Sequence, residues 1–188
     1  MISVIDVGVG NAKSVFNWIK RETEDCYLVA DPSEYRGGSL VIPGVCSSTQ
    51  LMSRLLSTGW KQKIISAAAH NRVLGICAGY QVLSQVSYED ERVTCLGLLP
   101  GKVVPISKTK SNTGWEKVEI DVSKLGSLKK GLGKRKKLKG WFYFNHCYAV
   151  ENGGLARNWQ ACGNVLGVQF HPEKSGLSGL PILEMLMS

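Results

Sequence analysis

The stretch LGICAGYQVL, residues 74–83, places a cysteine between two glycines where an apolar run ends. The residues RVLGI (72–76) have the composition of a strand that is buried on both faces of a parallel sheet. A helix pattern follows, and G-x-C-x-G between such a strand and helix is the cysteine form of the nucleophile elbow. The turn is tight, so the flanking residues must be small, which Gly75 and Gly79 are. The stretch therefore predicts that Cys77 is presented at the end of a sheet.

The expected helix start would also change the chemistry of the thiol. The positive end of a helix dipole and its free amides lower the pKa of a thiol. The amide of Ala78, directly after Cys77, could donate a hydrogen bond to an oxyanion. The alternative interpretation is a core cysteine beside two turn glycines.

A second candidate group lies in GVQFHPEKS (167–175), which continues an apolar strand. His171 and Glu173 are two residues apart, so on an extended segment their side chains would point the same way. Glu173 could orient the imidazole and leave its other nitrogen for a thiol. Because parallel α/β sheets carry their sites at strand ends, His171 and Cys77 are expected to meet in a Cys-His-Glu site. A surface histidine near a turn proline is the alternative.

The remaining pattern predicts the fold class. Strands alternate with helical patterns up to Tyr88, and glycine-separated strands dominate afterwards until a closing helix at 179–187. We expect an α/β fold: a three-layer, open, mostly parallel sheet with helices on both faces and an antiparallel strand extension. The first half is expected to hold strands at 2–6, 26–30, 39–44 and 72–76, and helical patterns after Asn11 and at 50–70. With no repeat or linker, residues 1–188 are expected to form a single domain.

Composition narrows the class of protein. Hydrophobic residues make up 44% and charged residues 20%, which is typical of a globular chain. No apolar run reaches the roughly 18 residues of a membrane span, and no basic region precedes the first apolar stretch, so we expect a cytoplasmic protein. The six cysteines form no CxxC pair, which argues against a zinc site, and we expect no metal and no cofactor.

The net charge of +8 is concentrated in LKKGLGKRKKLKG (128–140), where seven of thirteen residues are basic. A solvated loop is one interpretation of this segment, and a docking patch for an acidic partner is another. A nucleic-acid-binding module is a third hypothesis. It is disfavoured because no aromatic residues are interleaved with the charges.

The chain resembles the class I glutamine amidotransferases. GICAGYQ with GVQFHPEKS matches the class, and IDVGVGNAKSV, VIPGV, LGLLPGKV, the GW of GWEKVEI and WFYFNHCY resemble the glutaminase subunit of imidazole glycerol phosphate synthase. The resemblance implies a glutaminase with catalytic Cys77, His171 and Glu173 that forms a glutamyl thioester. It places the oxyanion site at Gly44, Val45 and Ala78. It places L-glutamine against Gly79, Gln81, His146, Cys147 and Tyr148.

The resemblance also implies a partner. Free ammonia is protonated in water, and the family passes it through a channel to a docked synthase, here a (β/α)8-barrel cyclase in a heterodimer. Asn11 and Lys174 match positions near that interface. From the residues alone, Asn11 is equally a helix cap and Lys174 a solvated lysine.

Several residues depart from the family pattern. Cys46 follows PGV where glycine is usual, Cys147 replaces serine, and Asn112 replaces a histidine. These changes leave the triad intact and suit a paralogue with another acceptor, such as a sugar amidotransferase of surface polysaccharide. A catalytically silent docking subunit is the remaining alternative.

Overall fold

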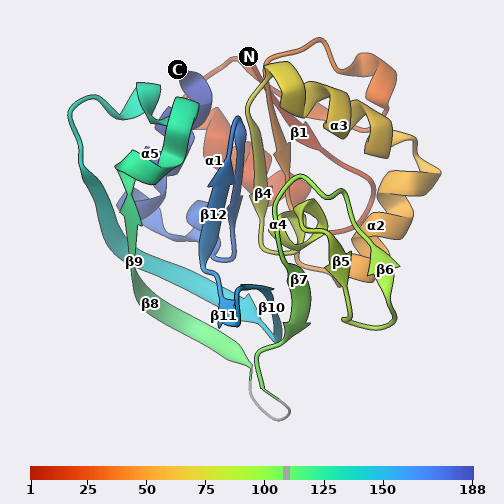
Figure 1. Ribbon diagram of the computed structural model, residues 1–188. Helices are drawn as coiled ribbons and strands as arrows, with labels where there is room; N and C mark the ends of the chain where they lie inside the picture. The colour runs from red at the N-terminus through yellow and green to blue at the C-terminus, as the bar shows by residue number, and fades with distance from the viewer. Residues whose placement is uncertain (108–110) are drawn as a thin grey trace.

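The computed structural model describes residues 1–107 and 111–188, and its centre is a six-stranded sheet of order β12-β13-β4-β3-β1-β2 (Figure 1). Neighbouring strands from β13 to β2 are parallel, and β12 pairs antiparallel with β13 at one edge. The bounds are β1 Ile2–Ile5, β2 Cys26–Val29, β3 Ser39–Ile42, β4 Val73–Ile76, β12 Trp159–Cys162 and β13 Val165–Val168. Strands β1, β3, β4 and β13 are buried throughout, as their apolar sequences predict.

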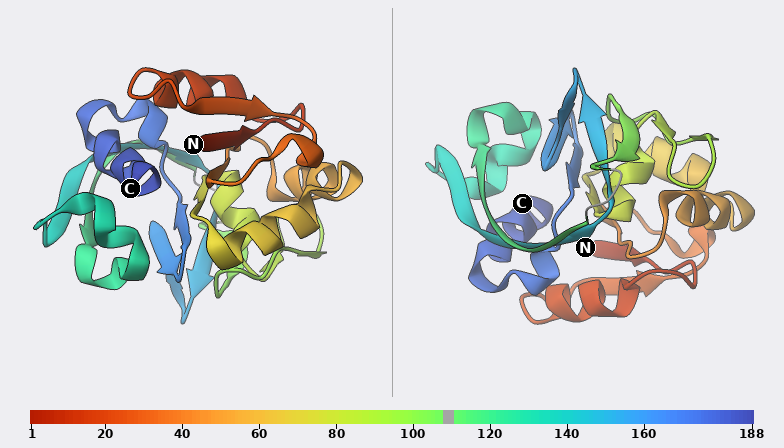
Figure 2. Two further views of the ribbon diagram at one scale, coloured as in Figure 1. Left: turned by 90° about the horizontal axis from the view of Figure 1, so that it is seen from above. Right: turned by 90° about the horizontal axis from the view of Figure 1, so that it is seen from below.

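Helices cover both faces of this sheet (Figure 2). On one face pack α2 (Ser48–Ser57), α3 (Trp60–His70) and the short α4 (Ala78–Leu83). On the other pack α1 (Ala12–Lys20), α5 (Leu180–Met187) and the 3-10 segment η2 (Val122–Leu132). Three short 3-10 turns complete the helical parts: η1 Pro32–Glu34, η3 Pro172–Lys174 and η4 Gly176–Gly179. The predicted three-layer α/β fold is confirmed.

The strand-rich part between α4 and β12 builds two further sheets. One has the order β11-β10-β7-β5-β6, with bounds β5 Val86–Ser87, β6 Val93–Thr94, β7 Lys102–Pro105, β10 Tyr148–Asn152 and β11 Leu155–Ala156. The other is the antiparallel pair β8 (Asn112–Asp121) and β9 (Lys137–His146). Alternation along this pair turns Val118, Phe142 and Phe144 into the core and leaves the opposite face in solvent.

The basic segment 128–140 differs from the predicted loop. It comprises the end of η2 and the start of β9. Ser127, just before it, donates its hydroxyl to the carbonyl of Gly163 and to Asn164 Oδ1, beside the amino end of β13. Cys77 follows the carboxyl end of β4, so the segment lies at the opposite end of the sheet. In the described part of the chain, no helix is long and apolar enough to cross a membrane.

One glycine of the central sheet makes room for a buried aromatic side chain. A Cβ added to Gly167 on β13 would lie 2.0 Å from Cδ2 of Tyr80, whose side chain is fully buried on α4. The ring cannot retreat without displacing other core groups, because the interior is close-packed.

We therefore expect Gly167→Ala to lower the free energy of unfolding by about 1–3 kcal/mol in urea denaturation. Tyr80→Leu removes the ring, so adding Gly167→Ala to that variant should cost clearly less than in the wild type. Fully additive effects would contradict this account of the packing.

Candidate active site

The backbone at Cys77 forms a sharp turn between β4 and α4. Its φ of 53° is the one positive value among the described non-glycine residues. The turn is closed by glycines: a Cβ on Gly79 would lie 1.8 Å from the carbonyl oxygen of Ile42, and one on Gly75 would lie 2.5 Å from that of Gly79. Both contacts exclude any larger residue. The expected elbow geometry is present.

The Cys77 thiol is enclosed. Cys77 is 5% exposed, and its Sγ lies 3.9 Å from the carbonyl oxygen of Asn145 and 3.7 Å from the Gln169 amide nitrogen. Burial raises the pKa of this thiol to about 12, although the Ala78 amide acts in the opposite direction. The Ala78 amide at the helix start lowers this pKa, as expected, but desolvation outweighs it and the net shift is upward.

His171 and Glu173 form the buried pair expected from GVQFHPEKS. Nδ1 of His171 lies 2.8 Å from Oε1 of Glu173. The pair does not lie on an extended segment as expected, because Glu173 belongs to the 3-10 turn η3. Among the described residues, Nε2 of His171 is buried without a hydrogen-bond partner. With Nδ1 donating to the carboxylate, neutral His171 keeps a free lone pair on Nε2, as a general base requires.

Asn11 supports this pair. Its Nδ2 donates a 2.7 Å hydrogen bond to Glu173 Oε1. Asn11 occupies the N-cap position of α1, as the helix-cap interpretation expects, but its side chain makes no cap hydrogen bond. The side chain is used to orient a carboxylate 162 positions away in the sequence.

The proposed oxyanion residues pack against the elbow. A Cβ on Gly44 would lie 2.6 Å from Cβ of Ala78 and 2.9 Å from the amide nitrogen of Gly79. Val45, the next residue, is 50% exposed. The segment after β3 therefore lies directly over the start of α4, and its role in oxyanion binding stays a prediction.

The expected glutamine-binding side chains meet at one backbone carbonyl. Gln81 Nε2 and His146 Nδ1 each lie 2.8 Å from the oxygen of Tyr148. Because a carbonyl only accepts, His146 carries its proton on Nδ1, and its Nε2 accepts from Asn112 Nδ2 at 3.3 Å. The hydrogen bonds from Gln81 and His146 hold the Tyr148 carbonyl in place. Cys147, which lies between His146 and Tyr148 in the sequence, is exposed.

Two residues near the thiol, Glu89 and Gln169, are not among the predicted site residues. Glu89 accepts hydrogen bonds from the amide and hydroxyl of Ser48 at 2.6 and 2.7 Å, and its charge acts on Cys77 in the direction that raises the thiol pKa. Gln169 contacts the thiol itself. Gln169 lies inside the QFHPE motif and could have been found there, whereas Glu89 reaches the site only through the folding of β5.

Exposed aromatic side chains extend from the site along the outer face of β8 and β9. Trp115 is 54% and Trp141 is 59% exposed, and the rings of Trp115 and Tyr143 meet edge to face at 5.8 Å. Nζ of Lys174 lies 5.3 Å from the centre of the Tyr143 ring. The carbonyl of Tyr143 accepts the backbone amide of His171 at 2.8 Å, so this face continues directly into the buried pair.

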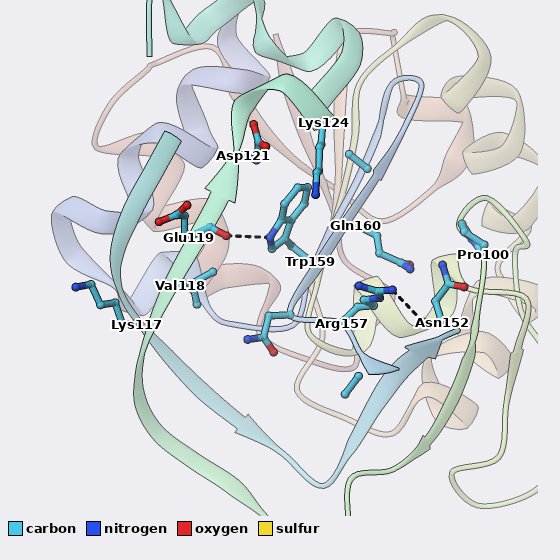
Figure 3. A pocket seen from close by; sticks show the side chains of 13 residues that line it. Pro100, Lys117, Val118, Glu119, Asp121, Lys124, Asn152, Arg157, Trp159 and Gln160 are labelled. Carbon is cyan, nitrogen blue, oxygen red and sulfur yellow. Dashed lines mark hydrogen bonds between the residues drawn. The ribbon is translucent and has the colours of Figure 1, made fainter. Parts of the chain in front are cut away.

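A hollow of about 650 Å³ lies elsewhere, between β8 and β12 (Figure 3). Neither Cys77 nor His171 lines it. With Cys77 at 5% and His171 at 0% exposure, the expected nucleophile and base are closed to a substrate in this conformation.

Comparison with known proteins gives a consistent relationship. Residues 16–141 match the CobB/CobQ-like glutamine amidotransferase domain family. The imidazole glycerol phosphate synthase subunit HisH of Bacillus licheniformis is 36% identical over 98% of this chain and 94% of that protein. Subunit HisH 2 of Legionella pneumophila is 34% identical over 100% and 98%. A crystal structure of a glutamine amidotransferase, 18% identical, superposes with a TM-score of 0.74 over 100% and 99% of the two chains and shows the same fold.

The hydrogen bonds of His146 predict its titration. Burial lowers the pKa of His146 from its ordinary value, so we expect a neutral ring with the proton on Nδ1 at pH 7. Asn112→Asp places a carboxylate opposite Nε2, which favours the cation and should raise the pKa. Nitrogen-15 NMR of the imidazole measures both the tautomer and the titration.

Asn112→Leu is the matched control, because it removes the donor without adding a charge and should leave the pKa low. A wild-type His146 that is protonated at pH 7, or equal titration in both variants, would contradict the assigned network.

Proposed function

Since the chain belongs to the class I glutamine amidotransferases and, within them, to the HisH family, we propose that it is a single-domain glutaminase subunit acting through Cys77, His171 and Glu173. The observation that carries the proposal is the buried His171–Glu173 pair with its free Nε2, since the Glu173 charge acts on the Cys77 thiol and Gln169, two residues before His171, contacts Sγ. The substrate is L-glutamine, and the products are glutamate and ammonia.

The chemistry follows from these groups. His171 Nε2 takes the thiol proton as Sγ of Cys77 attacks the side-chain carbonyl of glutamine. The tetrahedral oxyanion accepts hydrogen bonds from the Ala78 amide and from the Gly44–Val45 segment. His171 returns the proton to the departing ammonia, which leaves a glutamyl thioester. His171 then activates water, and the thioester is hydrolysed to glutamate and free thiol.

The high pKa of the resting thiol fits this sequence of steps. A thiol held protonated by burial gains little reactivity until substrate is bound and the base is aligned. Glu173, fixed by Asn11, keeps the Nδ1 proton in place and stabilises the imidazolium formed by proton transfer.

The remaining polar residues suit the ends of the substrate. The Glu89 carboxylate, whose charge is felt at Cys77, offers an ion pair to the substrate's α-ammonium group. Gln81 and His146 hold the Tyr148 carbonyl, and we assign the L-glutamine site to this backbone with Gly79 and Cys147. The steps require no cofactor.

Ammonia must reach its acceptor before it is protonated by water, so a docked synthase completes the function. The exposed Trp115 and Trp141, with Lys174 over Tyr143, form a surface with the aromatic character of interface hot spots. Asn11 is connected to this surface by hydrogen bonds, because it bonds to Glu173, Glu173 bonds to His171, and the His171 amide bonds to Tyr143. We assign this surface to a (β/α)8-barrel cyclase of imidazole glycerol phosphate synthase in a cytoplasmic heterodimer.

A second acceptor is favoured by the local departures from the family. Asn112 contacts His146, whose ring holds the Tyr148 carbonyl, and Cys147 lies between His146 and Tyr148 in the sequence. A relative bearing the name HisH 2 matches nearly end to end. A sugar amidotransferase is therefore the alternative acceptor. Glutamine-dependent product formation, measured separately with each synthase, distinguishes the two.

The roles of the triad predict graded losses of glutaminase activity. With the partner present, Cys77→Ala and His171→Ala should each lower kcat by about 10³-fold or more. Asn11→Ala removes one hydrogen bond to a carboxylate, and a loss of about 10–100-fold in kcat is expected.

Lys129→Ala, an exposed change at the far end of the sheet, is the control and should be fully active. Retention of activity by Cys77→Ala would refute the mechanism. Ammonia-dependent synthesis should survive in every variant, which shows that the synthase itself is intact, and calorimetry shows whether each variant still docks.

The docking surface makes its own prediction. Trp115→Ala and Trp141→Ala should each weaken synthase binding by about 30-fold, measured by calorimetry. Tyr27, 52% exposed on the opposite edge strand β2, is the matched aromatic control. Tyr27→Ala should leave the affinity for the synthase unchanged. Equal affinities of Trp115→Ala, Trp141→Ala and Tyr27→Ala would place the partner elsewhere.

A further inference from the structure

The hollow between β8 and β12, which we name the Trp159 hollow, is separate from the proposed catalytic site (Figure 3). Its volume of about 650 Å³ lies in the range of small-molecule sites. Residues from β8, the start of η2, the end of β10, the segment from β11 to β12, and β12 itself surround it. The charged and polar side chains and the indole of this lining include Glu119, Asp121, Lys124, Arg157, Trp159 and Gln160.

The acidic side chains of this lining are already engaged. Glu119 pairs with Lys137 and Lys139 at 2.5 and 2.9 Å, and in Figure 3 its carboxylate is directed away from Trp159. Asp121 Oδ1 accepts the amide and hydroxyl of Ser123 at 3.0 and 2.7 Å.

The cations are not engaged in the same way. In the described part of the chain, no carboxylate forms an ion pair with Lys124 or Arg157, and Figure 3 shows both side chains extending toward the hollow. The hydrogen bonds of Asp121 come from neutral donors, so its charge remains, but Lys124 and Arg157 outnumber it and the net free charge that faces the hollow is positive, which suits an anion.

Several groups in the hollow are held in place before any ligand binds. Arg157 Nη2 donates to the carbonyl of Asn152 at 3.1 Å, which fixes the guanidinium and leaves other N–H groups available. Trp159 Nε1 lies 3.3 Å from the carbonyl oxygen of Glu119, and the indole is partly buried against the core. This pre-organisation reduces the entropy that is lost on binding.

One lining atom lacks a partner. Oε1 of Gln160 is shielded from solvent, and no described residue donates to it. Such acceptors are rare in folded proteins because desolvation is costly. A donor group on a ligand in the hollow would satisfy it.

We propose that the Trp159 hollow binds a small organic phosphate that carries a planar ring. The phosphate lies between Lys124 and Arg157, where two cations from separate segments match a charge of about −2. The ring packs on Trp159, and a ligand donor bonds to Gln160. This site is independent of the glutaminase proposal, since it shares no residue with the triad.

Titration of the full-length, nitrogen-15-labelled chain with AMP tests the proposal, at about 0.15 M salt to screen surface charge. We expect saturable 1:1 binding with a shift of the Trp159 indole N–H. Adenosine and inorganic phosphate, each carrying half of the recognised chemistry, should bind at least about tenfold more weakly.

Lys124→Ala should weaken AMP binding by about tenfold or more, and so should Arg157→Ala. Lys124 is exposed, so its variant should fold even if the loss of Arg157 disturbs the turn. Lys117→Ala is the matched control, because Lys117 lines the rim but points away in Figure 3, and should bind within about twofold of wild type.

Four results would each overturn the proposal. They are no saturable AMP binding below about 10 mM, an equal loss in Lys117→Ala, phosphate binding as tight as that of AMP, and loss of binding when Cys77 carries a covalent glutamine analogue. The last result would place AMP in the catalytic site.

Discussion

The backbone turn at Cys77 is the constraint on which the rest of the site depends. A non-glycine residue at a φ of 53° is costly and persists only when its surroundings enforce it. Here Gly79 approaches the carbonyl of Ile42 and Gly75 approaches Gly79, so α4 is held against β3 and β4. The same contact brings Gly44 over Ala78, which joins the elbow and the segment after β3 in one unit.

The site assembled around this turn is closed to solvent. Burial keeps the thiol protonated, His171 has one nitrogen fixed and the other free, and Asn11 and Glu173 hold the ring in place. Such an arrangement limits wasteful hydrolysis of glutamine by the isolated chain. Asn145, whose carbonyl lies against the thiol, belongs to β9, the strand that also carries Tyr143 and Trp141 of the aromatic face.

The fold and the core of the site were predictable because each depends on local pattern. Apolar strands, the small residues of G-x-C-x-G and the His-Pro-Glu sequence are visible in the sequence. The hydrogen bond of Asn11 to Glu173 was not predictable, because Glu173 is 162 positions away and the local pattern is that of a helix cap. The helix start that lowers the thiol pKa is visible in the sequence, but the burial that outweighs it depends on enclosing strands that are not. Glu89 reaches the site only through tertiary packing.

The central claim is that the residue in this strained turn is the nucleophile. Intact-mass and peptide mass spectrometry after treatment with an electrophilic glutamine analogue, with the synthase bound, measures it directly. The account predicts one adduct per chain, on Cys77, blocked by excess glutamine and strongly slowed in His171→Ala. An adduct confined to the exposed Cys147 or Cys162, or an unmodified chain in the active complex, would contradict it.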